Sequence, residues 1–173
     1  ELEVVGDADY AHPGAEEVCN DGIDNDCDGG AGDCGLYGLV DLSSADATFL
    51  GERSLDHAGE HVAGAGDVNG DGLGDFLVAA RFHDPTDVLT SAGKVYLVLG
   101  RPAAGWGSRF DLGDADASFT GEAKEDYAGS AVASAGDVNG DGLDDFLVGA
   151  QHARGVANFG AAGRVYLVLG RRA

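Results

Sequence analysis

Two short acidic stretches carry the clearest chemistry in this chain. Each begins with Asp, continues with Asn and Asp at alternate positions, and ends with a fourth oxygen-bearing side chain at its ninth position. These residues are Asp67, Asn69, Asp71 and Asp75 in the first stretch and Asp137, Asn139, Asp141 and Asp145 in the second. This spacing is typical of a loop that folds around a hard cation such as Ca²⁺, which takes about 6 to 8 oxygen ligands.

The backbone of both stretches suits the same ion. Gly72 and Gly142, at the sixth position, permit a sharp turn, and Leu73 and Leu143, at the seventh, can offer a backbone carbonyl oxygen. Without a cation the carboxylates would repel one another, so we expect calcium binding and local folding to be coupled. An EF-hand is excluded because its twelfth position requires Glu, and both stretches have Val there. The alternative is that the Asn-Gly and Asp-Gly pairs mark only tight hairpin turns.

Both stretches belong to a repeat. Residues 41–101 match residues 111–171 at an offset of 70 without a gap, and 36 of the 61 positions are identical. The eighth loop position differs, with Gly74 in the first stretch and Asp144 in the second. We interpret Asp144 as a solvated surface charge.

The segments on either side of these loops have the residue pattern of β-strands. In the first unit, residues 47–50, 61–66, 76–78 and 95–99 form short apolar or small-residue runs separated by Gly-rich and Asp-rich turns. No segment has the length and period of an amphipathic helix. Four short strands per unit predict an all-β fold made of propeller blades.

Residues 39–171, and especially the segment AGSAVASAGDVNGDGLDDFLVGA, resemble the FG-GAP repeat found in the propeller of integrin alpha subunits and in many bacterial extracellular proteins. The resemblance implies two blades, over residues 39–108 and 109–173, with calcium held by the eight oxygen side chains named above. Two blades cannot close a propeller, so we expect a partial propeller that is open or completed by assembly. In the repeat order, residues 41–51 are an unpaired outer strand and the second unit lacks its fourth strand. Such edges can join head to tail, as a ring or a filament.

Residues 1–38 have no counterpart in the repeat. Asp24, Asp26 and Asp28 alternate before a Gly, and three cysteines lie nearby, a cluster that fits one local disulfide in an oxidising compartment. This segment resembles the MopE-type metal-binding motif of bacterial surface proteins and the thrombospondin type 3 calcium repeats. With that resemblance we predict a Cys19–Cys27 disulfide, with the pairing of Cys34 left open. We expect calcium rather than copper, which prefers imidazole or thiolate ligands. The alternative is an acidic, disulfide-pinned linker that holds no ion.

The amino-acid composition limits the classes of partner that this chain can bind. The chain has 31 acidic and 10 basic residues and a net charge of −21, so it would be repelled by nucleic acids and anionic membranes. Its apolar runs are far shorter than the roughly 20 residues that span a bilayer. We therefore expect calcium ions as partners and a secreted, extracellular or cell-surface location in a bacterium. Because the sequence begins with Glu1, we expect a mature or excised product.

We find no catalytic constellation. His57, Glu60 and His61 match the H-x-x-E-H string of zinc proteases, but that string works on a helix and this segment is predicted to be extended. We therefore expect no enzyme activity and no cofactor other than Ca²⁺. The leading hypothesis is a calcium-binding structural or adhesion module that self-associates or joins further blades. The alternatives are a lectin-like module that binds a protein or glycan through the variable loops 81–91 and 151–161, and an accessory domain of a larger secreted enzyme.

Overall fold

The structure is a computed structural model that describes residues 41–86, 90–102, 105–154 and 160–172. The chain divides into two compact units, Glu1–Ala45 and Asp46–Ala173. In the first unit, the described residues form a 3-10 turn, η1 (Leu42–Ser44), whose Ser43 N–H donates to Asp41 Oδ1 at 2.8 Å. The predicted metal motif and disulfide at Cys19, Asp24, Asp26, Cys27 and Asp28 lie outside the described residues.

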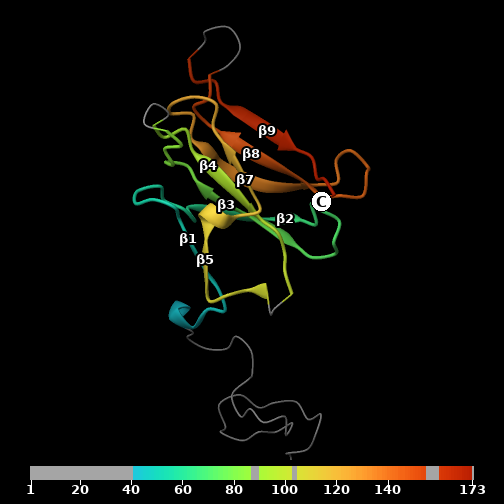
Figure 1. The fold of residues 1–173 in the computed structure, drawn as a ribbon. Coiled ribbons are helices and arrows are strands. Elements are labelled where there is room, and N and C mark those ends of the chain that lie inside the picture. The colour runs from blue at the N-terminus through green and yellow to red at the C-terminus, as the bar shows by residue number, and fades with distance from the viewer. Residues whose placement is uncertain (1–40, 87–89, 103–104, 155–159, 173) are drawn as a thin grey trace, which may run out of the picture. The chain divides into compact units, whose positions relative to one another are not determined.

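The second unit contains two antiparallel sheets (Figure 1). The first sheet has the order β2-β3-β4-β6, formed by β2 (His61–Gly66), β3 (Asp75–Ala80), β4 (Lys94–Val98) and β6 (Ala117–Thr120). The second sheet has the order β7-β8-β9, formed by β7 (Ala128–Gly136), β8 (Asp145–Ala150) and β9 (Arg164–Val168). The strands occupy the same repeat positions, and neither sheet closes on itself. This confirms the predicted all-β partial propeller.

The register of the two sheets follows the 70-residue repeat. Val78 lies opposite Tyr96 between β3 and β4, and Val148 lies opposite Tyr166 between β8 and β9. The difference is at the outer edge, because β4 pairs with β6 while β9 has no further partner among the described strands. The first sheet is therefore a complete four-stranded blade, and the second has three strands.

A cluster of apolar side chains joins the two sheets. It includes Leu77, Val95 and Leu97 from the first sheet and Phe146 and Val148 from the second. Phe119 of β6 packs against Phe146 with ring centroids 5.5 Å apart. The residues that alternate along each strand thus bury one face of the first sheet against one face of the second.

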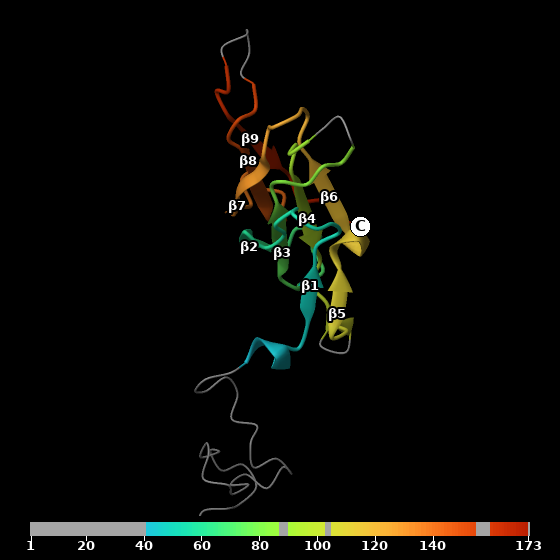
Figure 2. The ribbon, with the colours of Figure 1, turned by 90° about the vertical axis from the view of Figure 1, so that its left-hand side faces the viewer.

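The strand at residues 47–50 departs from its prediction. It forms β1 (Thr48–Leu50), which pairs in parallel with β5 (Arg109–Asp111), as Figure 2 shows. Phe49 holds β1 in place, since its ring packs against Phe76 at 5.1 Å and against Trp106 at 5.8 Å between centroids. The expectation of an unpaired first strand was therefore wrong. Strand β5 pairs with one edge of β1, and the aromatic contacts of Phe49 hold β1 in place.

A second 3-10 turn, η3 (Leu112–Asp114), follows β5. Its Leu112 is buried with Val78, Tyr96 and Val98 on the face of the first sheet that also carries Phe49. This side chain fills the space between the outer strands and the sheet, and its repeat counterpart is Leu42.

Candidate metal sites

The two predicted ion loops are the hairpins that join the first and second strands of each sheet. Residues 67–74 connect β2 to β3, and residues 137–144 connect β7 to β8. Both loops therefore occupy the same position in their hairpins, and in each loop the side chains at the third and fifth positions are hydrogen-bonded to each other.

The first Asp of each loop organises the turn. Asp67 Oδ1 accepts the N–H groups of Gly70 at 2.7 Å and Asp71 at 3.1 Å, and Asp67 Oδ2 accepts that of Gly72 at 2.9 Å. Gly70 and Gly72 have φ values of +77° and +87°, which glycine adopts readily. Asp137 accepts the equivalent three bonds in the second loop.

These amide contacts act on the acidity of the first Asp. The N–H of Gly72 lowers the pKa of Asp67 most, with further help from Gly70 and Asp71. Bonds from Gly142 and its neighbours lower the pKa of Asp137 in the same way. Both carboxylates are therefore held in the charged form, which is the form that binds a cation.

The third and fifth positions bind to each other. Asn69 Oδ1 accepts the N–H of Asp71 at 2.9 Å, and Asn69 Nδ2 donates to Asp71 Oδ2 at 2.8 Å. Asp71 Oδ1 also accepts the N–H of Leu73 at 2.8 Å. Asn139, Asp141 and Leu143 repeat this arrangement.

The ninth position anchors each loop to its sheet. Asp75 is buried, and its carboxylate accepts the N–H of Val68 at 2.8 Å and that of Gly100 at 2.7 Å. Burial raises its pKa, and the charges of Asp71 and Asp67 raise it further. A cation beside these three carboxylates would offset their repulsion.

Asp145 has the same role in the second loop. It is fully buried and accepts the N–H groups of Val138 at 2.9 Å and Gly170 at 2.8 Å. The ninth-position Asp therefore ties the loop to the end of the third strand in both sheets.

The donor set of each loop fits a hard cation, because it consists of Asp and Asn oxygens and the carbonyl at the seventh position. In the conformation described here these oxygens accept the loop's own N–H groups. Among the described residues, no three His, Cys, Asp or Glu side chains are grouped as they would be around a metal ion. The hairpin-turn interpretation therefore accounts for the hydrogen bonds that the loops make in this structure, and a bound cation would draw on the same carboxylates.

Asp144 connects the two loops, so its interpretation as a solvated surface charge was wrong. Its Oδ2 accepts the N–H of Asp67 at 2.8 Å, and its own N–H donates to the carbonyl of Asp67 at 3.1 Å. Gly66 makes room for this contact, because a Cβ there would lie 2.1 Å from Asp144 Oδ2. One feature of the sequence points to this role: Asp144 differs from its counterpart Gly74 within a nearly identical loop.

The H-x-x-E-H string at His57, Glu60 and His61 spans a loop and the start of a strand. His57 lies in the loop before β2 and packs against Phe82, while His61 begins β2. Sequence reasoning missed a different pair: His83 Nδ1 lies 2.6 Å from Asp56 Oδ2, and both side chains are buried. No helix in the described part of the chain is long and apolar enough to span a membrane.

Comparison with known proteins agrees with this arrangement. The model of the FG-GAP repeat matches residues 58–98 and 128–168, which run from before the first strand of each sheet to the end of its third. The model of the MopE-type copper-binding family, a metal-binding motif, matches residues 7–33.

The chain also aligns with a curated relative, an integrin alpha subunit. Integrin alpha-8 of Gallus gallus is 35% identical over 125 residues, an alignment that covers 68% of this chain and 11% of the integrin. The chain thus spans about a tenth of the length of this relative. We conclude that the chain carries two FG-GAP repeats of the integrin alpha type, preceded by a MopE-type metal-binding motif.

Proposed function

We propose that this chain is a calcium-binding extracellular module with a structural or adhesive role and no catalytic activity of its own. One observation carries the proposal: two separate hairpins repeat the same oxygen side chains at the same loop positions and fold them alike. The proposed ligands are Asp67, Asn69, Asp71, Asp75 and the Leu73 carbonyl, and Asp137, Asn139, Asp141, Asp145 and the Leu143 carbonyl.

The chemistry of the donors supports calcium over transition metals. The loops offer oxygen ligands without imidazole or thiolate, which suits a hard cation. The net charge of −21 attracts cations to the whole molecule. We extend the proposal to Asp24, Asp26 and Asp28, which lie within the residues matched by the metal-binding motif, and retain the Cys19–Cys27 disulfide as part of it.

The likeness to an integrin alpha subunit and to the MopE-type motif supports an extracellular location. We divide the chain into a metal-binding segment at residues 1–38 and two repeats at residues 39–108 and 109–173. The open edges of the sheets support head-to-tail self-association as the structural role.

Thermal unfolding tests the calcium proposal. We expect millimolar Ca²⁺ to raise the Tm of the full chain relative to excess chelator, because a ligand at about 100 times its Kd stabilises the folded state by about 2.7 kcal/mol. The double variant Asp71→Asn, Asp141→Asn keeps hydrogen-bonding side chains but removes one charge from each loop, so most of the calcium-induced rise should disappear.

The matched control is Asp114→Asn, which removes an exposed charge outside the loops. This variant should keep the full response to calcium. The proposal fails if the parent chain melts at the same temperature with calcium and with chelator.

A further inference from the structure

Asp144 holds the backbone of the first ion loop at two points, which we call the Asp144 contact. Its Oδ2 accepts the N–H of Asp67 at 2.8 Å, and its own N–H donates to the carbonyl oxygen of Asp67 at 3.1 Å. Both backbone polar groups of Asp67 are therefore bound to one residue of the second loop. Because Asp67 is the first proposed ligand of its loop, the Asp144 contact acts on the residue at which that site begins.

The effect of this contact extends through the first loop by way of the Asp67 carboxylate. That carboxylate accepts the N–H groups of Gly70, Asp71 and Gly72, which fixes the turn that carries the third and fifth positions. Groups that bind a metal ligand from outside the site fix the orientation of that ligand. The orientation of Asp67, and with it the path of the turn, therefore depends on a residue 77 positions away.

Further hydrogen bonds hold the start of the first loop against the second repeat. The N–H of Arg171, which follows β9, donates to the carbonyl oxygen of Val68 at 2.8 Å. The N–H of Val68 donates to Asp75 Oδ2 at 2.8 Å. Residues 67 and 68 thus have all four backbone polar groups bound, three of them by the second repeat.

The Asp144 contact depends on residues that differ from those around them. A Cβ at Gly66 would lie 2.1 Å from Asp144 Oδ2, so a larger residue at position 66 would displace the carboxylate. The counterpart of Asp144 is Gly74, and among the described residues nothing lies within 4 Å of a Cβ placed there. The eighth position therefore makes this contact in the second loop and leaves open space in the first.

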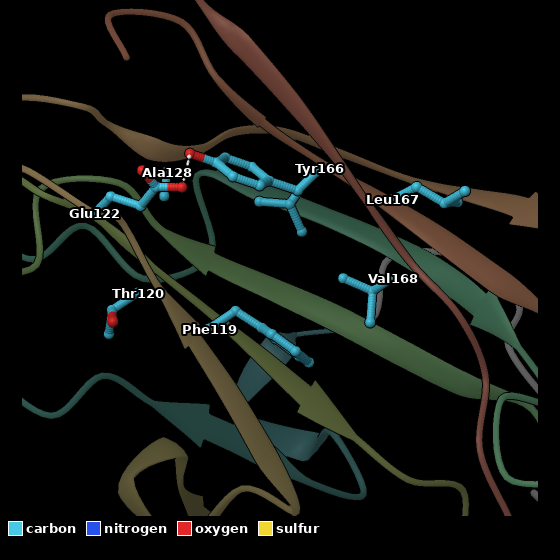
Figure 3. A pocket seen from close by; sticks show the side chains of 8 residues that line it. Phe119, Thr120, Glu122, Ala128, Tyr166, Leu167 and Val168 are labelled. Atoms are coloured by element: carbon cyan, nitrogen blue, oxygen red, sulfur yellow. Dashed lines mark hydrogen bonds between the residues drawn. The ribbon is translucent and has the colours of Figure 1, made fainter. Parts of the chain in front are cut away.

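Side-chain packing between the two sheets is incomplete. A pocket of about 310 Å³ is bordered by Phe119 of β6 and Tyr166 of β9, among other residues (Figure 3). Another pocket, of about 370 Å³, is bordered in part by Val68 and Asn69 of the first loop. Because side chains leave space beside this loop, the hydrogen bonds from the second repeat contribute to its position.

We infer that Asp144 is a positioning residue for the cation of the first loop. It is not a ligand itself, and it holds the backbone of Asp67 so that the Asp67 carboxylate faces the ion. The inference rests on the proposed calcium function and assigns a residue of the second loop to the affinity of the first. Loss of a group that orients a metal ligand typically lowers metal affinity by about 10- to 100-fold.

Isothermal titration calorimetry of the full chain tests the inference one loop at a time. Asp141→Asn disables the second loop, Asp71→Asn disables the first, and the double variant gives the heat from any other site, which is subtracted. In the Asp141→Asn background, Asp144→Ala should raise the Kd for Ca²⁺ by about 10-fold. In the Asp71→Asn background, the same change should leave the Kd close to its starting value, because the Asp144 side chain binds the first loop.

A charge-transfer variant separates position from charge. Gly74→Asp combined with Asp144→Gly keeps the net charge and moves the carboxylate to the eighth position of the first loop. The Asp67 backbone then loses its partner while the first loop gains a charge of its own. In the Asp141→Asn background, the Kd should stay well above that of the unchanged Asp144. Asp144→Asn, which keeps an acceptor oxygen, should recover part of the affinity lost in Asp144→Ala.

Circular dichroism and urea denaturation in chelator show whether each variant folds before it is titrated. The inference is overturned if Asp144→Ala leaves the Kd of the first loop unchanged, if it weakens both loops equally, or if the charge-transfer variant binds as tightly as the unchanged Asp144. In each of these cases the parent still binds Ca²⁺ at both loops, so the proposed function stands. A parent chain that binds no Ca²⁺ contradicts the proposed function and the inference together.

Discussion

Single residues at matching repeat positions have different partners. Asp56 and Asp126 are counterparts and both are buried. Asp56 contacts the His83 ring, whereas Asp126 accepts the N–H of Ala123 at 2.8 Å. The counterpart of His83 is Ala153, so the first repeat alone uses a side-chain pair at this place.

We predict that His83→Ala lowers the free energy of unfolding by about 3 kcal/mol, because it leaves the buried Asp56 without its ring partner. Urea denaturation of the full chain measures this change. His152→Ala is the control: this exposed ring packs edge-on against Tyr127, and its loss should cost less than about 1 kcal/mol. Equal small losses in both variants would show that the buried pair does not stabilise the fold.

At the scale of elements, the two ion loops are hydrogen-bonded to each other. Asp144, in the second loop, accepts the N–H of Asp67 in the first, and the N–H of Arg171 donates to the carbonyl of Val68 at 2.8 Å. Neither contact follows from the hairpins taken separately. The first ion loop is therefore held at the contact between the sheets by the Asp144 side chain of the second loop and by the backbone of Arg171, which follows β9.

Asp144→Ala removes the charged acceptor of this contact and should lower the free energy of unfolding by about 1.5 kcal/mol, measured in chelator. Asp144→Asn retains an acceptor oxygen and should recover part of the loss. Asp114→Ala, an exposed site in η3, should change stability by less than about 0.5 kcal/mol. If Asp144→Ala behaves like Asp114→Ala, the loops are not coupled through this side chain.

At the scale of the whole molecule, the repeat made the two sheets predictable. The strands and hairpins follow from local patterns, namely apolar runs separated by Asp-Gly turns, and the same pattern occurs twice. The pairing of β1 with β5 could not be predicted in this way, because it depends on Phe49 packing against Phe76 and Trp106 from distant parts of the chain.

In the candidate site, the positions of the two loops were predictable from the sequence, but their contacts with distant residues were not. The spacing predicts two equivalent hairpin loops, and the structure shows the same hydrogen bonds in both, while their role as calcium ligands stays a prediction. The contact of Asp144 with Asp67 and the pair of His83 with Asp56 join residues 77 and 27 positions apart, and periodicity carries no information at those separations.

Calcium binding by the two hairpin loops is the central claim, and isothermal titration calorimetry tests it most directly. We predict that the full chain binds Ca²⁺ and that Asp71→Asn, Asp141→Asn binds about two ions fewer, one for each loop, since each loop loses a ligand charge. Asp114→Asn should bind as many ions as the parent. A parent chain that releases or absorbs no heat of binding at any temperature tested, or a double variant that binds the same number of ions with the same affinity, would contradict the account.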